Sequence, residues 1–139
     1  MKLFKIDAGY YNGVPRINIY LLRILFILMA VFVGSISWNS VITYAGDWDP
    51  VRAVAFCVWA SYSLLAVLGI FYPLRLLMIV IFEIIYKIIW LIIVAFPLWS
   101  AGKLEGSSAE EMTYSFVWVL LPIVAMPWRY FFRTYILPK

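Results

Sequence analysis

Residues 79–97 read IVIFEIIYKIIWLIIVAFP, an apolar run that is interrupted by one acid, Glu83, and one base, Lys87. A helix needs about 20 apolar residues to cross the hydrocarbon core of a bilayer, which is roughly 30 Å thick. The run is therefore predicted to span a membrane, with both charges inside the hydrocarbon. Each charge at that depth costs on the order of 3 kcal/mol on insertion scales, so the pair requires an explanation.

The composition of the whole chain also indicates a membrane protein. Of its 139 residues, 66% are hydrophobic and only 13% are charged, whereas about a quarter of the residues of a soluble domain are charged. The net charge of +4 comes from basic residues dispersed at the ends of apolar runs, and a nucleic-acid site requires a basic cluster. We therefore expect a multi-pass protein of the cell (plasma or inner) membrane, with the lipid bilayer and no nucleic acid among its partners.

Four apolar runs follow one another along the chain. Their predicted boundaries are residues 17–42, 51–72, 74–99 and 113–130. Asp49 and Pro50 suit the N-cap and the first position of the second helix, and Pro73 separates the second helix from the third. The chain is predicted to be an all-α integral membrane protein, with residues 1–139 forming a single domain, a bundle of four transmembrane helices.

The basic residues predict the orientation, because Lys and Arg accumulate on the cytoplasmic side of short loops. With the N-terminus inside, eight basic residues face the cytoplasm: Lys2, Lys5, Arg16, Arg23, Arg75, Arg129, Arg133 and Lys139. Two basic residues, Arg52 and Lys103, then lie outside. Both termini are therefore predicted to be cytoplasmic.

Glu83 and Lys87 share one helical face because they are four residues apart, and Tyr86 and Trp90 extend that face. One interpretation is a functional seam in the bundle interior or at a subunit interface, which binds a charged group or relays protons. The other is a structural ion pair that neutralises itself or fixes helix packing. A proton pathway normally has titratable groups on facing helices. The other spans carry arginine only close to their ends, where it can snorkel to the headgroups, and otherwise offer only Ser, Thr, Asn, Tyr and Cys.

Two prolines, Pro122 and Pro127, are predicted to kink the fourth span, because each removes a backbone hydrogen bond. Pro127 frees the carbonyl of Ile123, which by residue count lies at a depth similar to that of Lys87. One hypothesis is that Lys87 or a water molecule caps this carbonyl. The alternative is an ordinary kink whose carbonyl is satisfied by water or a neighbouring hydroxyl.

Small residues in the first two spans predict close helix packing, because they let helix backbones approach one another in lipid. The second span carries Ala53, Cys57, Ser61 and Gly69 on one face, and the first carries Ala30 and Gly34. We expect these residues to lie between the two helices.

The sequence offers no catalytic residue, metal site or cofactor site. It contains no histidine and a single cysteine, Cys57. A Ser-His or Cys-His nucleophile is therefore excluded, and a zinc site would lack its usual ligands. Motifs for phosphate or dinucleotide binding are also absent from the sequence. We expect the protein not to be an enzyme and to carry no cofactor and no metal.

Three functions are consistent with these patterns. The first is a small transport or channel subunit that uses the Glu83 and Lys87 pair to select a solute or ion. The second is a non-catalytic accessory or scaffold subunit of a larger membrane complex. The third is a lipid or hydrophobic-ligand binder with Trp59, Trp90 and Trp118 as an aromatic lining. Homo-oligomers are expected because a single four-helix unit encloses little interior.

Overall fold

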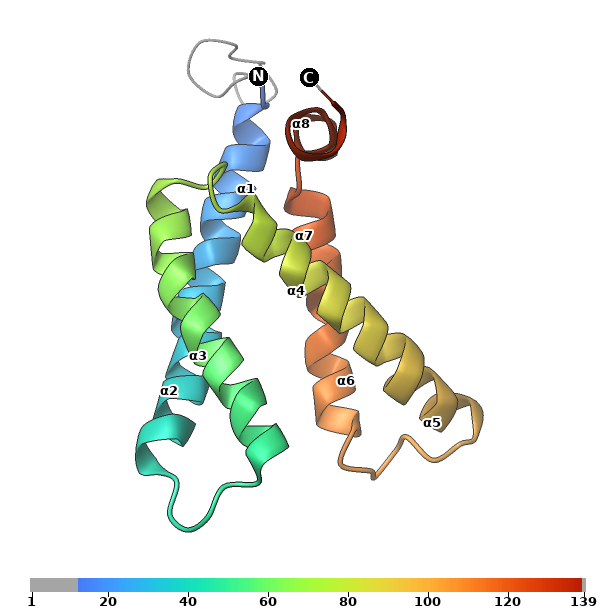
Figure 1. The fold of residues 1–139 in the computed structure, drawn as a ribbon. Helices are drawn as coiled ribbons and strands as arrows, with labels where there is room; N and C mark the ends of the chain where they lie inside the picture. Colours follow the sequence, from blue (N-terminus) through green and yellow to red (C-terminus); the bar gives the residue numbers. More distant parts are fainter. Residues whose placement is uncertain (1–12, 139) are drawn as a thin grey trace.

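A computed structural model describes residues 13–138, and every regular element in this range is a helix (Figure 1). Three of the helices are long and apolar enough to cross a membrane. They are α1–η2–α2 (Arg16–Leu28, Met29–Val33 and Gly34–Thr43), α3 (Pro50–Phe71) and α4–η3–α5 (Leu77–Trp90, Leu91–Ala95 and Phe96–Ser100). The predicted all-α class with several apolar helices is confirmed. Lys2, Lys5 and Lys139 lie outside the described residues.

The fourth apolar region consists of two helices joined by a bend of 75°. Its first half is α6–η4–α7 (Glu110–Phe116, Val117–Val119 and Leu120–Ala125), and its second half is α8–η5 (Trp128–Phe131 and Phe132–Ile136). The structure therefore has up to four candidate spans if the bent pair is counted as one. The predicted fourth span, residues 113–130, differs from the observed helices because it runs across this bend.

The helix starts follow local chemistry. The carboxylate of Asp49 accepts a hydrogen bond from the backbone N–H of Val51, at 3.3 Å, and Pro50 occupies the first position of α3. This confirms the predicted N-cap. The third long helix begins at Leu77, later than the predicted residue 74, because the chain forms turns over residues 73–76 after Pro73.

Close packing joins the first helix to α3. A Cβ atom added at Gly69 would lie 2.5 Å from the ring of Phe26, which is fully buried. Gly34 likewise faces Ser63, to which an added Cβ would lie 3.3 Å away. The small-residue prediction holds for these two glycines, whereas Cys57 is exposed and does not lie in this contact.

The face of α3 that packs on the first helix is therefore rotated from the predicted one. Its buried residues are Ala60, Tyr62, Ser63, Ala66 and Gly69. Ser61 is exposed, like Cys57. The side chains of Cys57 and Ser61 instead face a hollow between α3 and α4.

The bend after α7 follows from Pro127, which has no N–H to offer the carbonyl of Ile123. The indole Nε1 of Trp128 donates to that carbonyl instead, at 2.9 Å, and Asn18 Nδ2 of α1 donates to the carbonyl of Ala125, at 3.1 Å. The hypothesis that Lys87 caps Ile123 is wrong, because the Lys87 ammonium pairs with a carboxylate on its own helix. The alternative prediction was a carbonyl satisfied by water or a hydroxyl, and the donor to the Ile123 carbonyl is instead an indole N–H.

The other proline of this region, Pro122, causes a smaller distortion. Pro122 is the third residue of α7, and α7 directly follows the 3-10 segment η4 (Val117–Val119). The tighter turn accommodates the missing backbone N–H, so α6, η4 and α7 continue as one helix.

The helices diverge at the turn between α3 and α4 (Figure 1). The first helix and α3 form an antiparallel pair, whereas α4–α5 leaves the turn at a steep angle to α3. The helix α7 contacts both α1 and α4 and so holds the diverging helix to the pair. The two helices α3 and α4 therefore form the sides of a wedge that opens away from the turn (Figure 1).

Candidate functional site

An ion pair lies on the inner side of α4. Glu83 and Lys87 are one helical turn apart, and the Lys87 ammonium donates a hydrogen bond to the Oε1 atom of Glu83. Glu83 is only 3% exposed. The Lys87 nitrogen also lies 5.7 Å from the ring centre of Phe116 on α6, and the electron-rich face of an aromatic ring attracts a cation. The lysine therefore has two electrostatic partners.

The second carboxylate oxygen of Glu83 makes fewer polar contacts than the first. Oε2 is buried and has no hydrogen-bond partner among the described residues. An ionised carboxylate can accept about four hydrogen bonds, and this one accepts a single bond from Lys87. The pair is thus neutral in charge but retains hydrogen-bonding capacity inside the protein.

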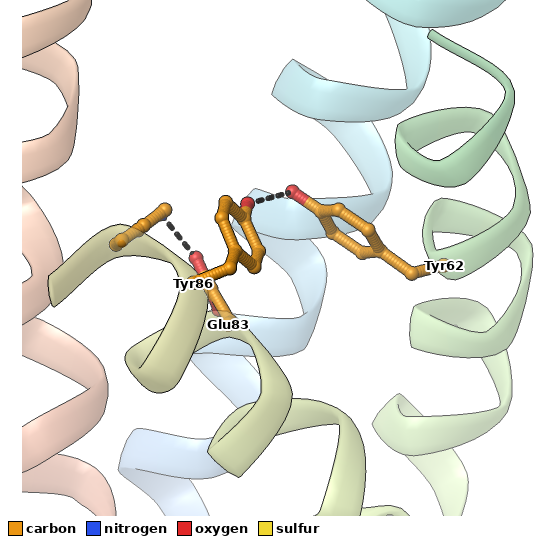
Figure 2. A network of polar contacts seen from close by, with 4 residues as sticks. Tyr62, Glu83 and Tyr86 are labelled. Carbon is orange, nitrogen blue, oxygen red and sulfur yellow. Dashed lines mark hydrogen bonds and ion pairs between the residues drawn. The ribbon is translucent and has the colours of Figure 1, made fainter. Parts of the chain in front are cut away.

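Tyr86 links α4 to α3. Figure 2 shows Tyr86 of α4 and Tyr62 of α3 pointing toward one another, with Glu83 on the neighbouring turn of α4. The two phenol oxygens are 3.3 Å apart and share a hydrogen bond. Tyr62 is 5% exposed. The sequence does not identify Tyr62, and this buried phenol is the partner that α3 supplies to Tyr86.

A groove of about 640 Å³ lies between α3 and α4, with α6 closing one side. Aromatic and apolar side chains form most of its wall. The wall includes Arg52, Phe56, Trp59, Tyr86, Trp90 and Phe116. The rings of Trp90 and Phe116 meet edge to face at 5.0 Å, and those of Phe56 and Trp59 at 5.4 Å. One aromatic pair thus lies on α3, and the other joins α4 to α6.

A second hollow of about 570 Å³ lies beside the groove, against another face of α3 and nearer the turn between α3 and α4. The two hollows share Val58 and Phe82, and the second also contacts Cys57 and Ser61. The exposed small residues of α3 therefore line this space and are not packed against another helix.

Arg52 is the only charged side chain among the residues that line the two hollows. It lies in the first turn of α3, at the open end of the wedge, and its guanidinium carbon is 5.6 Å from the ring centre of Phe56. The site is therefore a long apolar groove with one cation at its end. Such a site suits a molecule with an apolar tail and an anionic head.

The predicted site residues divide into two groups. Tyr86 and Trp90 line the groove, whereas Glu83 and Lys87 lie outside its wall. Pro122 and Pro127 do not line it either. Of the three tryptophans expected to form an aromatic lining, Trp59 and Trp90 do so, and Trp118 is 65% exposed and does not.

Sequence reasoning had treated Arg52 only as a topology signal. A sharper signal was present, since Arg52, Phe56 and Trp59 recur at helical spacing on α3. Tyr86 and Trp90 recur in the same way on α4. Which two stripes face one another could not be read from either helix alone.

No family model, curated protein or solved structure matches the chain. Among residues 13–138, no group of three or more His, Cys, Asp or Glu side chains could hold a metal ion. The function is therefore inferred from the groove and the buried pair themselves.

Proposed function

We propose that the protein is a multi-pass membrane protein that binds one anionic membrane lipid in the groove between α3 and α4. The observation that carries the proposal is the groove itself, whose wall is apolar and aromatic and whose single charge is Arg52. A phosphate headgroup would bind the guanidinium, which forms forked hydrogen bonds with phosphate oxygens. The acyl chain would lie against Trp59 and Trp90.

The exposed surface of the long helices supports insertion in a bilayer. On α4–η3–α5 the exposed fraction is 52% for Ile85, 61% for Ile92 and 60% for Phe96. Contiguous apolar surface of this kind is rare on soluble monomers. We place the end with Arg16, Arg75 and the bent helix on the cytoplasmic side, in keeping with the distribution of basic residues.

The length of the groove fits a lipid chain. The α3 residues that line the two hollows together run from Arg52 to Leu65, and 13 residues at 1.5 Å each span about 20 Å. One leaflet of the hydrocarbon core is about 15 Å thick. With Arg52 at the outer surface, the two hollows together would extend from the outer headgroups past the middle of the bilayer, which is the depth that an acyl chain reaches.

Native mass spectrometry of the protein released from gentle detergent tests the proposal. A retained phospholipid mass is expected on the wild-type protein, with lower occupancy in Arg52→Gln because the headgroup loses its cation. Trp90→Ala should lower occupancy by removing part of the wall. The matched control is Lys103→Gln, which removes an exposed cation from the loop after α5 and should leave occupancy unchanged.

Two results would contradict the lipid proposal. One is a wild-type protein that carries no lipid when it is extracted from the same membrane as a control protein that does. The other is a dimer or a complex with a second protein that Trp90→Ala dissociates, because the groove would then hold a helix of a neighbouring chain. That second result would favour the accessory or homo-oligomeric roles.

A transport function is a second candidate, which the buried Glu83 favours. Its Oε2 atom has no hydrogen-bond partner in the described part of the chain, and it lies beside the Tyr86 and Tyr62 link between helices. Such a group can accept a proton or a solute donor. Solute flux in liposomes should then be lost in Glu83→Gln while the helical circular dichroism is retained. Unchanged flux would remove Glu83 from the transport site.

A further inference from the structure

The bent helix α8–η5 lies across one end of the protein, close to the start of α1 (Figure 1). Two contacts fix it there in addition to the 75° bend. Phe131 is buried, with 5% exposure, and the hydroxyl of Tyr135 donates to the carbonyl of Leu74, at 3.3 Å, in the turn between α3 and α4. The contacts of Phe131 and Tyr135 thus hold α8–η5 at an angle to the long helices.

One face of this helix is apolar and exposed. Trp128, Phe132 and Ile136 recur every four residues, and their exposed fractions are 36%, 47% and 58%. The ring centres of Trp128 and Phe132 are 6.1 Å apart in a stacked arrangement. The Trp128 indole donates to the carbonyl of Ile123 on α7, so the first residue of this face points toward the apolar helix α7. An aromatic face in this position suits the boundary between headgroups and acyl chains.

The neighbouring face of the same helix is basic. Arg129 and Arg133 each follow an aromatic residue by one position and are therefore turned about 100° from the apolar stripe. Both are exposed. The segments that meet at this end, residues 13–23, 72–77 and 126–138, contain five arginines and neither Asp nor Glu. The described segments at this end are therefore basic, which is complementary to an anionic lipid surface.

We propose that α8–η5 lies flat in the headgroup layer of one leaflet and that its arginines bind anionic phospholipid headgroups there. The apolar stripe then enters the outer part of the hydrocarbon, and the basic face meets the phosphates. This site is separate from the groove between α3 and α4, whose single cation, Arg52, lies at the opposite end of α3. The proposal therefore does not depend on lipid binding in the groove.

Electron paramagnetic resonance with spin-labelled lipids measures the headgroup preference. Phosphatidylglycerol should associate with the reconstituted protein more strongly than phosphatidylcholine. In Arg129→Gln the preference should fall by about fivefold, the factor expected for one arginine near an anionic surface. Lys103→Gln removes one exposed cation at the other end of the protein and should leave the preference as in the wild-type protein. An equal association of the two lipids with the wild-type protein would overturn the proposal.

A depth measurement gives a second, independent readout. A spin label at Ile136→Cys, in a Cys57→Ser background, should show oxygen and nickel-chelate accessibilities intermediate between two reference positions. Ser108→Cys supplies the aqueous reference and Ile92→Cys the hydrocarbon reference, because both residues are exposed. A label at position 136 that behaves like the aqueous reference would show that the helix leaves the membrane. One that behaves like the hydrocarbon reference would show that it enters the bilayer core, and either result would overturn the proposal.

Discussion

Replacing Lys87 with methionine should destabilise the protein strongly, because it leaves a buried carboxylate without its cation. Methionine has a similar length and no charge, so the space beside Phe116 stays filled. Glu83 is 3% exposed and its Oε2 atom already lacks a partner among the described residues. Burial leaves the carboxylate little access to water that could replace the lost hydrogen bond.

The size of the effect follows from the burial of the pair. Removing one partner of a buried ion pair costs about 3–5 kcal/mol, because the remaining charge is uncompensated. The contact between the Lys87 ammonium and Phe116, at 5.7 Å, is lost as well. Replacing both charges with apolar residues of similar volume is often neutral or stabilising. The double variant Glu83→Leu/Lys87→Met should therefore lie within about 1 kcal/mol of the wild-type protein or above it.

Reversible unfolding in mixed micelles, with increasing sodium dodecyl sulfate and circular dichroism as the signal, measures these differences. The double-mutant cycle with the two single variants isolates the coupling between the side chains. A Lys87→Met protein that unfolds within 1 kcal/mol of the wild type would refute the reasoning, as would a double variant that is as unstable as the single one. The first result would mean that the Glu83 carboxylate makes other hydrogen bonds, and the second that the cost does not come from an uncompensated charge.

Two further stability predictions follow from close contacts. Gly69→Ala should lower the free energy of unfolding by about 1–3 kcal/mol, because the new methyl group would overlap the buried ring of Phe26; unfolding in mixed micelles measures it, and an unchanged midpoint would contradict the packing. Trp128→Phe should cost about 1 kcal/mol by leaving the carbonyl of Ile123 without its indole donor. The same variant should increase the motion of a spin label at position 136, and unchanged label mobility would argue against this anchor.

The helical class and the positions of the long apolar helices could be predicted because they depend on local properties. Hydropathy and length identify the long helices, and Asp49 with Pro50 marks the start of α3. The fourth region was harder, since a proline can either kink a helix or end it. The choice at Pro127 depends on Asn18, a residue more than 100 positions away, whose side chain caps the carbonyl of Ala125.

The candidate site could be predicted only in part, for a similar reason. Spacing on one helix placed Glu83 and Lys87 together and put Tyr86 near them. It could not show that Tyr62 would face Tyr86, because the contact depends on the angle at which α4 leaves the turn after α3. The groove with Arg52 at its end likewise exists only once that angle is set.

The position of Cys57 allows the second hollow, beside the groove, to be observed by chemical labelling. It is the only cysteine of the chain, and it is exposed in the hollow between α3 and α4. A thiol-reactive fluorophore or a fluorine-bearing reagent would therefore attach at a single position of the unaltered protein. Its reaction rate and its spectrum would report, in real time and in native membranes, whether the space beside it is filled.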